Sequence, residues 1–356
     1  MSVDIVDPRI EAEPVGWRDF CRRAGLPPVW DYQLMRTEAW LARNPPVLAI
    51  VHNGPQVVGA LSVMVCRTFR DPAFAPRPPR RLRRPRPVWA EVYLPLLSGY
   101  PACVFDRSMD AAARRASLRH FERELVRFLG VGTLGVVYRA MTPEVGLAAV
   151  GRGRVAREID PTSVMRNRWS SFADWLATLS PRLRAIVHRL AGDDTLHVTT
   201  GSERTDLDGR ELATLLNAHR ARQDARAWAE GQRSRVGGLH LDTRSPVAAA
   251  YLDAFVRRRD VVTTEYRDLN GRLLAFNTMI DHKVSSAVHH WAAVPGGEGG
   301  RKELYVDAYA RCVRQMIEHG RPELTAGRTL LDVKGELGFE TRPLTSVAVP
   351  RPLLGR

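Results

Sequence analysis

The chain has 356 residues, of which 44% are hydrophobic and 26% are charged, and its excess of Lys and Arg over Asp and Glu gives a formal charge of +14. This length predicts two domains, and this composition excludes wholesale disorder, a collagen-like chain and a coiled coil. No apolar stretch approaches the roughly 18 residues that a membrane-spanning helix needs.

Residues 1–14 carry several acids and neither a basic nor an apolar segment, so we expect no secretion signal and a cytoplasmic protein. The four cysteines form no Cys-x-x-Cys pair and show no zinc-ligand spacing, which predicts buried free thiols and no metal site. Arginine supplies nearly all of the positive excess. That composition suits phosphate recognition but also follows from genomic base composition, so a nucleic-acid partner and a plain basic surface both stay open.

The first half is predicted to contain a β-hairpin followed by a basic loop. Two valine-containing runs, 47–51 and 56–66, flank an Asn53-Gly54 turn, which is the strongest short hairpin signal. The stretch 67–88 is predicted to be a loop, because its prolines remove backbone donors and its arginines repel one another.

The remaining elements follow from hydrophobic spacing, serine and aspartate caps, and β-branched runs. The predicted helices cover 106–129, 171–179, 180–190, 208–229, 245–255 and 304–319. The predicted strands cover 134–141, 261–268, 272–281, 284–294 and 329–333. The stretch 151–168 contains glycine, arginine and proline and is interpreted as a linker, so we expect domains over 1–155 and 156–356.

Helix, hairpin, third strand, glycine-rich loop, helix and final strand form the order of the acyltransferase fold named GNAT, and the first half shows a weaker copy. Short motifs at 270–275, 288–291 and 330–338, with the basic helix that Ser180-Pro181 opens, resemble the Fem-type and BioF2-like branch of that superfamily. The resemblance covers most of the chain. It implies an α/β protein of two tandem GNAT-like domains, with the acyl-transfer site in the second.

The resemblance also implies transfer of an acyl group to an amine, with no cofactor beyond the donor. Fem-type members take the group from aminoacyl-tRNA, and BioF2-like relatives take it from acyl-CoA. A CoA donor needs a Gln/Arg-x-x-Gly-x-Gly/Ala loop after a strand, whereas the matching string here, 127–132, ends a helix and is interpreted as its cap. The glycine-rich loop 295–302 lacks the CoA spacing, but its Arg301 and Lys302 suit phosphate.

Lys334 is the first catalytic candidate. It occupies the lysine position of the Lys-x-x-Leu/Phe-Gly motif of Fem-type proteins, where that lysine lies near the 3′ end of the donor. Attack of an amine on an ester makes an oxyanion, and one cation beside it lowers the barrier by roughly 3–4 kcal/mol. The alternative is a surface lysine paired with Asp332 or Glu336.

His289 is the second catalytic candidate, as the base that takes the proton of the amine. Strand alternation predicts that His289 and Trp291 share one face while His290 takes the other, so only one histidine would face the site. The alternative is core packing of both side chains. Further substrate-binding candidates are Asn277, Glu265 and Tyr266 on the neighbouring strands and Arg182, Arg184 and Arg189 on the basic helix.

RNA-binding candidates are the basic loop and the cations of the glycine-rich loop, namely Arg80, Arg81, Arg83, Arg84, Arg86, Arg301 and Lys302. Motifs typical of hydrolases, kinases and metalloenzymes are absent from the sequence. The sequence therefore predicts an aminoacyl-tRNA-dependent acyltransferase that forms an amide bond on an amine of a small metabolite or peptide. An acyl-CoA-dependent N-acyltransferase and a noncatalytic RNA-binding protein remain the alternatives.

Overall fold

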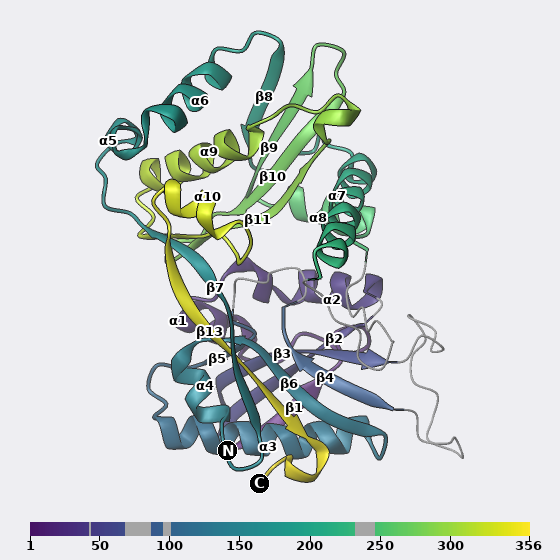
Figure 1. Cartoon of the computed structure of the whole chain (residues 1–356). Helices are drawn as coiled ribbons and strands as arrows, with labels where there is room; N and C mark the ends of the chain where they lie inside the picture. The colour runs from purple at the N-terminus through teal and green to yellow at the C-terminus, as the bar shows by residue number, and fades with distance from the viewer. Residues whose placement is uncertain (43, 68–86, 95–100, 232–245) are drawn as a thin grey trace. The chain divides into compact units, whose positions relative to one another are not determined.

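The computed structural model describes residues 1–42, 44–67, 87–94, 101–231 and 246–356 (Figure 1). They form two compact units. Unit 1 comprises Met1–Pro161 with Arg342–Arg356, and unit 2 comprises Thr162–Asp242 with Pro246–Thr341. The expected second domain, 156–356, therefore differs at its end, because the last strand pairs with a strand of unit 1 and carries Arg342–Arg356 with it.

Unit 1 is built on a mixed sheet. Its strand order is β1 (Ser2–Val6), β2 (Pro46–Asn53), β3 (Gln56–Arg67), β4 (Val88–Val92), β6 (Thr133–Met141) and β13 (Glu340–Pro350), with β5 (Cys103–Phe105) beside β3. Its helices are α1 (Trp17–Ala24), α2 (Tyr32–Leu41), α3 (Ala111–Leu129) and α4 (Pro143–Ala149), with short 3-10 turns at Pro28–Trp30 and Arg351–Leu353. The predicted hairpin is confirmed, and Gly54 at its turn adopts φ 59°.

In unit 2 the strand order is β7 (Val155–Arg166), β12 (Glu323–Thr325), β11 (Ser286–Ala293), β10 (Leu273–Ile280), β9 (Val261–Asp268) and β8 (Leu196–Gly201). Its helices are α5 (Phe172–Thr178), α6 (Pro181–Ala191), α7 (Gly209–Ala229), α8 (Ala249–Val256), α9 (Leu304–Glu318) and α10 (Leu331–Glu336), with a 3-10 turn at Gly296–Glu298. Helices α5, α6 and α9 pack on one face of β9–β11, and α7 and α8 lie on the other (Figure 1).

The two units repeat one connectivity. In each, an antiparallel hairpin leads to a third strand, a long helix and a strand parallel to the third: β2-β3-β4-α3-β6 in unit 1 and β9-β10-β11-α9-β12 in unit 2. The expected α/β class and tandem GNAT-like order are confirmed.

Local signals explain the elements that the sequence predicts well. The Ser171 side chain accepts from the Asp174 N–H while Asp174 accepts from the Ser171 N–H, a complete capping box for α5. The Ser180 side chain caps α6, whose first helical residue is Pro181. Because these caps act over three or four residues, the helices at 171–179 and 180–190 follow from sequence alone.

Two predictions of local structure are wrong. The supposed linker 151–168 contains strand β7, which pairs with β12 through Val164–Arg166, a long-range contact that composition does not encode. The supposed strand 329–333 is replaced by helix α10, because Leu330 adopts φ 52° and accepts the first helical hydrogen bond from the Lys334 N–H at 3.2 Å. Lys334 therefore lies on a helix.

The basic loop 67–88 lies almost entirely outside the described residues, and so do all five of its candidate RNA-binding arginines. Cys66, Cys103 and Cys312 are buried and Cys21 is half-buried, all as free thiols, as predicted. In the described part of the chain, no helix combines the length and apolarity needed to cross a bilayer.

Candidate active site

Lys334 lies in the interior of unit 2. The residue is 1% exposed, and its Nζ donates a hydrogen bond to the Ala326 carbonyl at the end of β12. The Tyr309 hydroxyl donates to the same carbonyl at 3.5 Å. Within the described part of the chain Lys334 is buried and forms no ion pair, so the alternative, a surface lysine paired with Asp332 or Glu336, is wrong.

Burial lowers the pKa of Lys334 to about 8, because a charged ammonium loses hydration inside the protein. At neutral pH the ammonium form still dominates. An ammonium has three N–H donors, and the Ala326 carbonyl takes one of them. The remaining donors can stabilise a developing negative charge in a low-dielectric setting.

A row of aromatic rings, the aromatic wall, begins beside this lysine. The Tyr309 ring centroid lies 5.8 Å from Lys334 Nζ. Tyr309 contacts Tyr305 at 4.6 Å and Phe339 at 5.6 Å, and Tyr305 contacts Trp291 at 5.4 Å between ring centroids. Trp291 is the one predicted residue in this wall. Sequence analysis did not identify Tyr305 and Tyr309, although their i,i+4 spacing on α9 indicates that both lie on one face of the helix.

The sheet opens beside Lys334. Strands β11 and β12 run parallel but pair only at Ser286 with Leu324 and at Ala287 with Thr325, after which β11 continues to Ala293 without β12. Ala326, the Lys334 acceptor, directly follows the last paired residue of β12. The cation is therefore held where the two strands separate, and the Trp291 ring stands further along the open strand.

A β-bulge overturns the predicted alternation on β11. Asn277 opposes Trp291 and Met279 opposes Val288, so His289 and His290 together face Thr278. The two imidazoles stack at 3.9 Å, and both pack on Phe255 of α8. Both histidines thus lie on the α8 side, whereas Trp291 packs on α9.

This environment also changes the chemistry of the histidines. Burial lowers the pKa of His290 to about 3 and, with His290 and Arg220 beside it, lowers the pKa of His289 well below its usual range. The structure does not bring His289 to Lys334 or Trp291, and its role as a base stays a prediction that this geometry does not favour.

The candidates on β9 and β10 divide between the two faces. On the α9 side, the Tyr266 hydroxyl donates to Asp307 at 2.9 Å and the Asn277 amide donates to Cys312 at 3.2 Å. Glu265 faces the other side and binds Arg204 at 2.5 Å and Arg267 at 2.8 Å. All three side chains are buried and engaged within unit 2, which is typical of structural positions.

The predicted phosphate-binding cations are scattered. Arg189 pairs with Glu303, and Arg301 binds Asp193 at 2.8 Å and the Thr195 hydroxyl at 2.6 Å. Arg182 and Lys302 are exposed and Arg184 is half-buried. In the described residues there is no group of three or more His, Cys, Asp or Glu side chains suited to hold a metal ion.

No protein-family model and no curated protein matches the chain. Solved structures do match. L-PGS from Bacillus licheniformis has a TM-score of 0.55 at 10% identity, and the match covers 97% of this chain and 98% of the L-PGS chain. FemX has a TM-score of 0.56 at 10% identity, covering 95% of this chain and 97% of its own.

A tandem GNAT protein from the clavulanic acid biosynthesis pathway has a TM-score of 0.51 at 13% identity and covers 98% of each chain. The chain has the tandem GNAT fold. The similarity spans both units of the tandem GNAT fold, and FemX shares it, so the predicted resemblance to the Fem-type branch is confirmed for the fold.

Proposed function

We propose that this tandem GNAT-fold chain is an acyltransferase that moves an aminoacyl group from tRNA to an amine of a small metabolite or peptide. The observation that carries the proposal is Lys334: a buried ammonium without a carboxylate partner in the described residues, beside an aromatic wall where two parallel strands separate. FemX and L-PGS, which share the fold, support the aminoacyl class. With charged tRNA as donor, the reaction would be cytoplasmic.

In the proposed step, the neutral amine attacks the ester carbonyl carbon of the donor. The carbon–nitrogen bond forms, the ester carbon–oxygen bond breaks, and the ribose oxygen leaves while the amine gives up one proton and the ribose hydroxyl gains one. Lys334 donates from Nζ to the oxyanion of the tetrahedral intermediate. Removing one such donor typically costs 100-fold to 1000-fold in rate.

Three contacts favour tRNA over CoA. Glu303 stands at the N-cap of α9, which follows the glycine-rich loop, and pairs with Arg189, so a diphosphate there would meet a carboxylate and a cation already engaged. Arg301 is engaged by Asp193. An extended CoA arm would pair along an open strand edge, but the Ala293 N–H donates to His219 at 3.4 Å and its carbonyl accepts from Arg222 at 2.8 Å.

The test compares Lys334→Met with wild type in acyl transfer from charged total tRNA and, in parallel, from a panel of acyl-CoAs, with RNase treatment of each. Methionine keeps the length and apolar stem while removing the charge. We expect kcat to fall roughly 100-fold or more while donor affinity changes little. Lys283→Met, on an exposed lysine of unit 2, is the matched control.

The outcomes separate the alternatives. Loss confined to donor affinity would make Lys334 a binding residue, and transfer that survives RNase and requires CoA would replace tRNA as donor. RNA binding without transfer from any donor would favour the noncatalytic alternative.

The basic loop, outside the described residues, has its own test. If Arg80, Arg81, Arg83, Arg84 and Arg86 contact tRNA phosphates, replacing all five by Ser should weaken tRNA binding and flatten its salt dependence by about 0.9 in log-log slope per lost contact. A filter-binding titration across salt concentrations measures this slope. An unchanged slope would assign the loop to solubility.

A further inference from the structure

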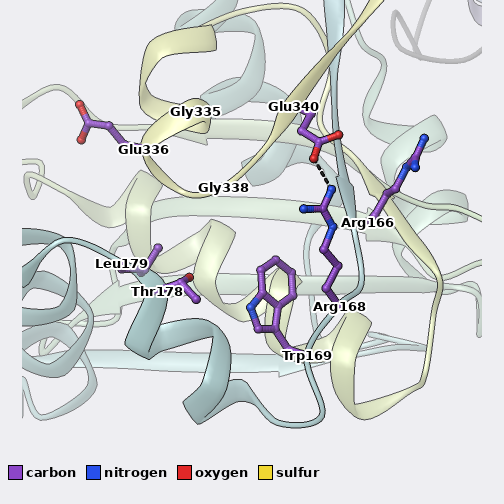
Figure 2. A pocket seen from close by; sticks show the side chains of 9 residues that line it. All are labelled: Arg166, Arg168, Trp169, Thr178, Leu179, Gly335, Glu336, Gly338 and Glu340. Carbon is purple, nitrogen blue, oxygen red and sulfur yellow. Dashed lines mark hydrogen bonds and ion pairs between the residues drawn. The ribbon is translucent and has the colours of Figure 1, made fainter.

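A cavity of about 300 Å3 lies in unit 2, on elements that adjoin the Lys334 helix (Figure 2). It is lined from the end of β7 and the residues after it, the end of α5, the C-terminal half of α10 and the start of β13. A volume of this size accommodates a metabolite or a short peptide. Sequence analysis missed it because the stretch that supplies its arginines was interpreted as a linker.

Four charged side chains line the cavity, two arginines and two glutamates. Arg166 is the last residue of β7, Arg168 follows it by two positions, and both are exposed. Arg168 pairs with Glu340, whereas Arg166 forms no ion pair among the residues that the structure describes. Glu336 and Arg166 stand on opposite sides of the cavity, and the charged groups of both exposed side chains point outward at its rim (Figure 2).

Between these ends the lining consists of two apolar side chains and Thr178, and it is partly bare of side chains. The Trp169 indole stands beside Arg168, and Leu179 lines the far side (Figure 2). Gly335 and Gly338 leave the backbone of α10 and its end open to the cavity. A Cβ at Gly335 would meet nothing within 4 Å, so the space beside it is unfilled by the protein.

We propose that this cavity binds a short peptide with free termini. The exposed side chains of Arg166 and Glu336 would rotate inward, so that Arg166 binds the peptide carboxylate and Glu336 its ammonium, while the apolar side chains pack between Trp169 and Leu179. Glu340 on Arg168 already shows that this wall holds a carboxylate. The planar guanidinium forks of arginine match a carboxylate better than other cations do.

The balance of charge selects a zwitterion over a phosphate ligand. Two arginines face two glutamates on the lining, so a dianionic phosphate would gain from Arg166 and Arg168 but meet repulsion from Glu336 and Glu340. A peptide with free termini places one charge at each end and complements both. If acyl transfer is the function, this peptide is the amine acceptor, and that identification rests on the proposed function, whereas binding itself does not.

The experiment is isothermal titration of the full chain with the dipeptide leucyl-leucine, its C-terminal amide, its N-acetyl derivative and AMP. We expect the dipeptide to bind, and each blocked derivative to bind about tenfold more weakly, because each loses one charge-assisted hydrogen-bonded contact. AMP should not compete.

Three variants sharpen the test. Arg166→Gln and Glu336→Gln should each weaken the dipeptide about tenfold, whereas Arg210→Gln, an exposed arginine on α7, should leave its affinity unchanged. Gly335→Ala adds one methyl to the open space and favours the helix, so it should weaken binding without lowering the thermal midpoint.

Absence of dipeptide binding, equal binding by Arg166→Gln, or displacement of the dipeptide by AMP would each overturn the proposal. Dipeptide binding without acyl transfer to it from any donor would refute the acceptor role while the binding site stands, whereas absence of transfer to every amine tested would refute the proposed function. Acyl transfer to dipeptides that is unaffected by Arg166→Gln would leave the function intact and remove this cavity from it.

Discussion

Two buried cations, one in each unit, are held in opposite ways. In unit 1, Arg154 has a side chain that is 2% exposed and forms two bonds to Glu122, at 2.6 and 2.8 Å, and Glu122 also accepts from the Tyr138 hydroxyl at 2.9 Å. In unit 2, Lys334 is more deeply buried, 1% exposed as a whole residue against 8% for Arg154, but its described contacts are one carbonyl and one ring. Arg154 is neutralised in place, whereas Lys334 keeps its charge uncompensated.

The parallel strand pairs of the two units also differ in how far they stay paired. In unit 1, β4 and β6 stay paired in parallel from Val88 to Val92, five positions in all, whereas β11 and β12 pair at two positions. The same connectivity thus gives a closed, charge-balanced layer in unit 1 and an open one in unit 2. An uncompensated buried charge is costly, and such sites concentrate where chemistry needs them.

Arg154→Met should produce the largest effect on stability. It leaves the buried Glu122 carboxylate with only the more distant Arg119, at 3.5 Å, and breaking a buried pair in this way costs roughly 3–5 kcal/mol. Chemical denaturation measures the free energy of unfolding, with the exposed Arg115→Met on α3 as control. A loss no larger than that of the control would mean that the Glu122 cluster does not hold unit 1 together.

The second effect is acid destabilisation by the stacked histidines. Because the pKa of folded His290 is lowered to about 3, the unfolded chain binds the extra proton as the pH falls below about 6.5, and stability declines over that window. Between pH 6.5 and 4.5 we expect the free energy of unfolding of the wild type to fall by about 2–3 kcal/mol more than that of His290→Leu. Denaturation at several pH values checks this, with the exposed His188→Leu as control. Parallel curves for wild type and His290→Leu would contradict it.

The smallest expected change in stability is that of Lys334→Met. Replacing a buried, uncompensated ammonium by an apolar side chain of similar length should be neutral or stabilising by about 1 kcal/mol. The same denaturation experiment tests this, and it separates the two cations most sharply when run beside Arg154→Met. Destabilisation of Lys334→Met by several kcal/mol would make that lysine a structural residue like Arg154.

The sequence predicts the parts of this fold that depend on neighbouring residues. The Asn53-Gly54 hairpin and the caps at Ser171 and Ser180 are set within a few positions of the chain. Strand β7 and helix α10 depend on partners far along the chain, so composition misassigned both. Long-range pairing therefore limits what local patterns can show.

The candidate site divides in the same way. Lys334 and Trp291 were found because a family motif and a strand pattern marked them. The β-bulge that turns His289 and His290 to the α8 side depends on the register of β10 against β11, which no local pattern specifies. The cavity at Arg166 and Arg168 was missed with the strand that carries it.

The central claim is that Lys334 acts as an ammonium. The most direct measurement is the pH dependence of kcat/KM for acyl transfer, which reports ionisations of the free enzyme. Because burial lowers the pKa of Lys334 to about 8, we expect kcat/KM to fall with a midpoint near pH 8 in wild type, and this falling limb to be absent in Lys334→Met. Because a peptide α-amino group itself titrates at about pH 8, the assay uses an acceptor whose amine has a pKa well below that range, and spontaneous donor hydrolysis is subtracted at each pH. A rate that rises through pH 8, as a neutral lysine acting as base would give, or a falling limb that persists in Lys334→Met, would contradict the account.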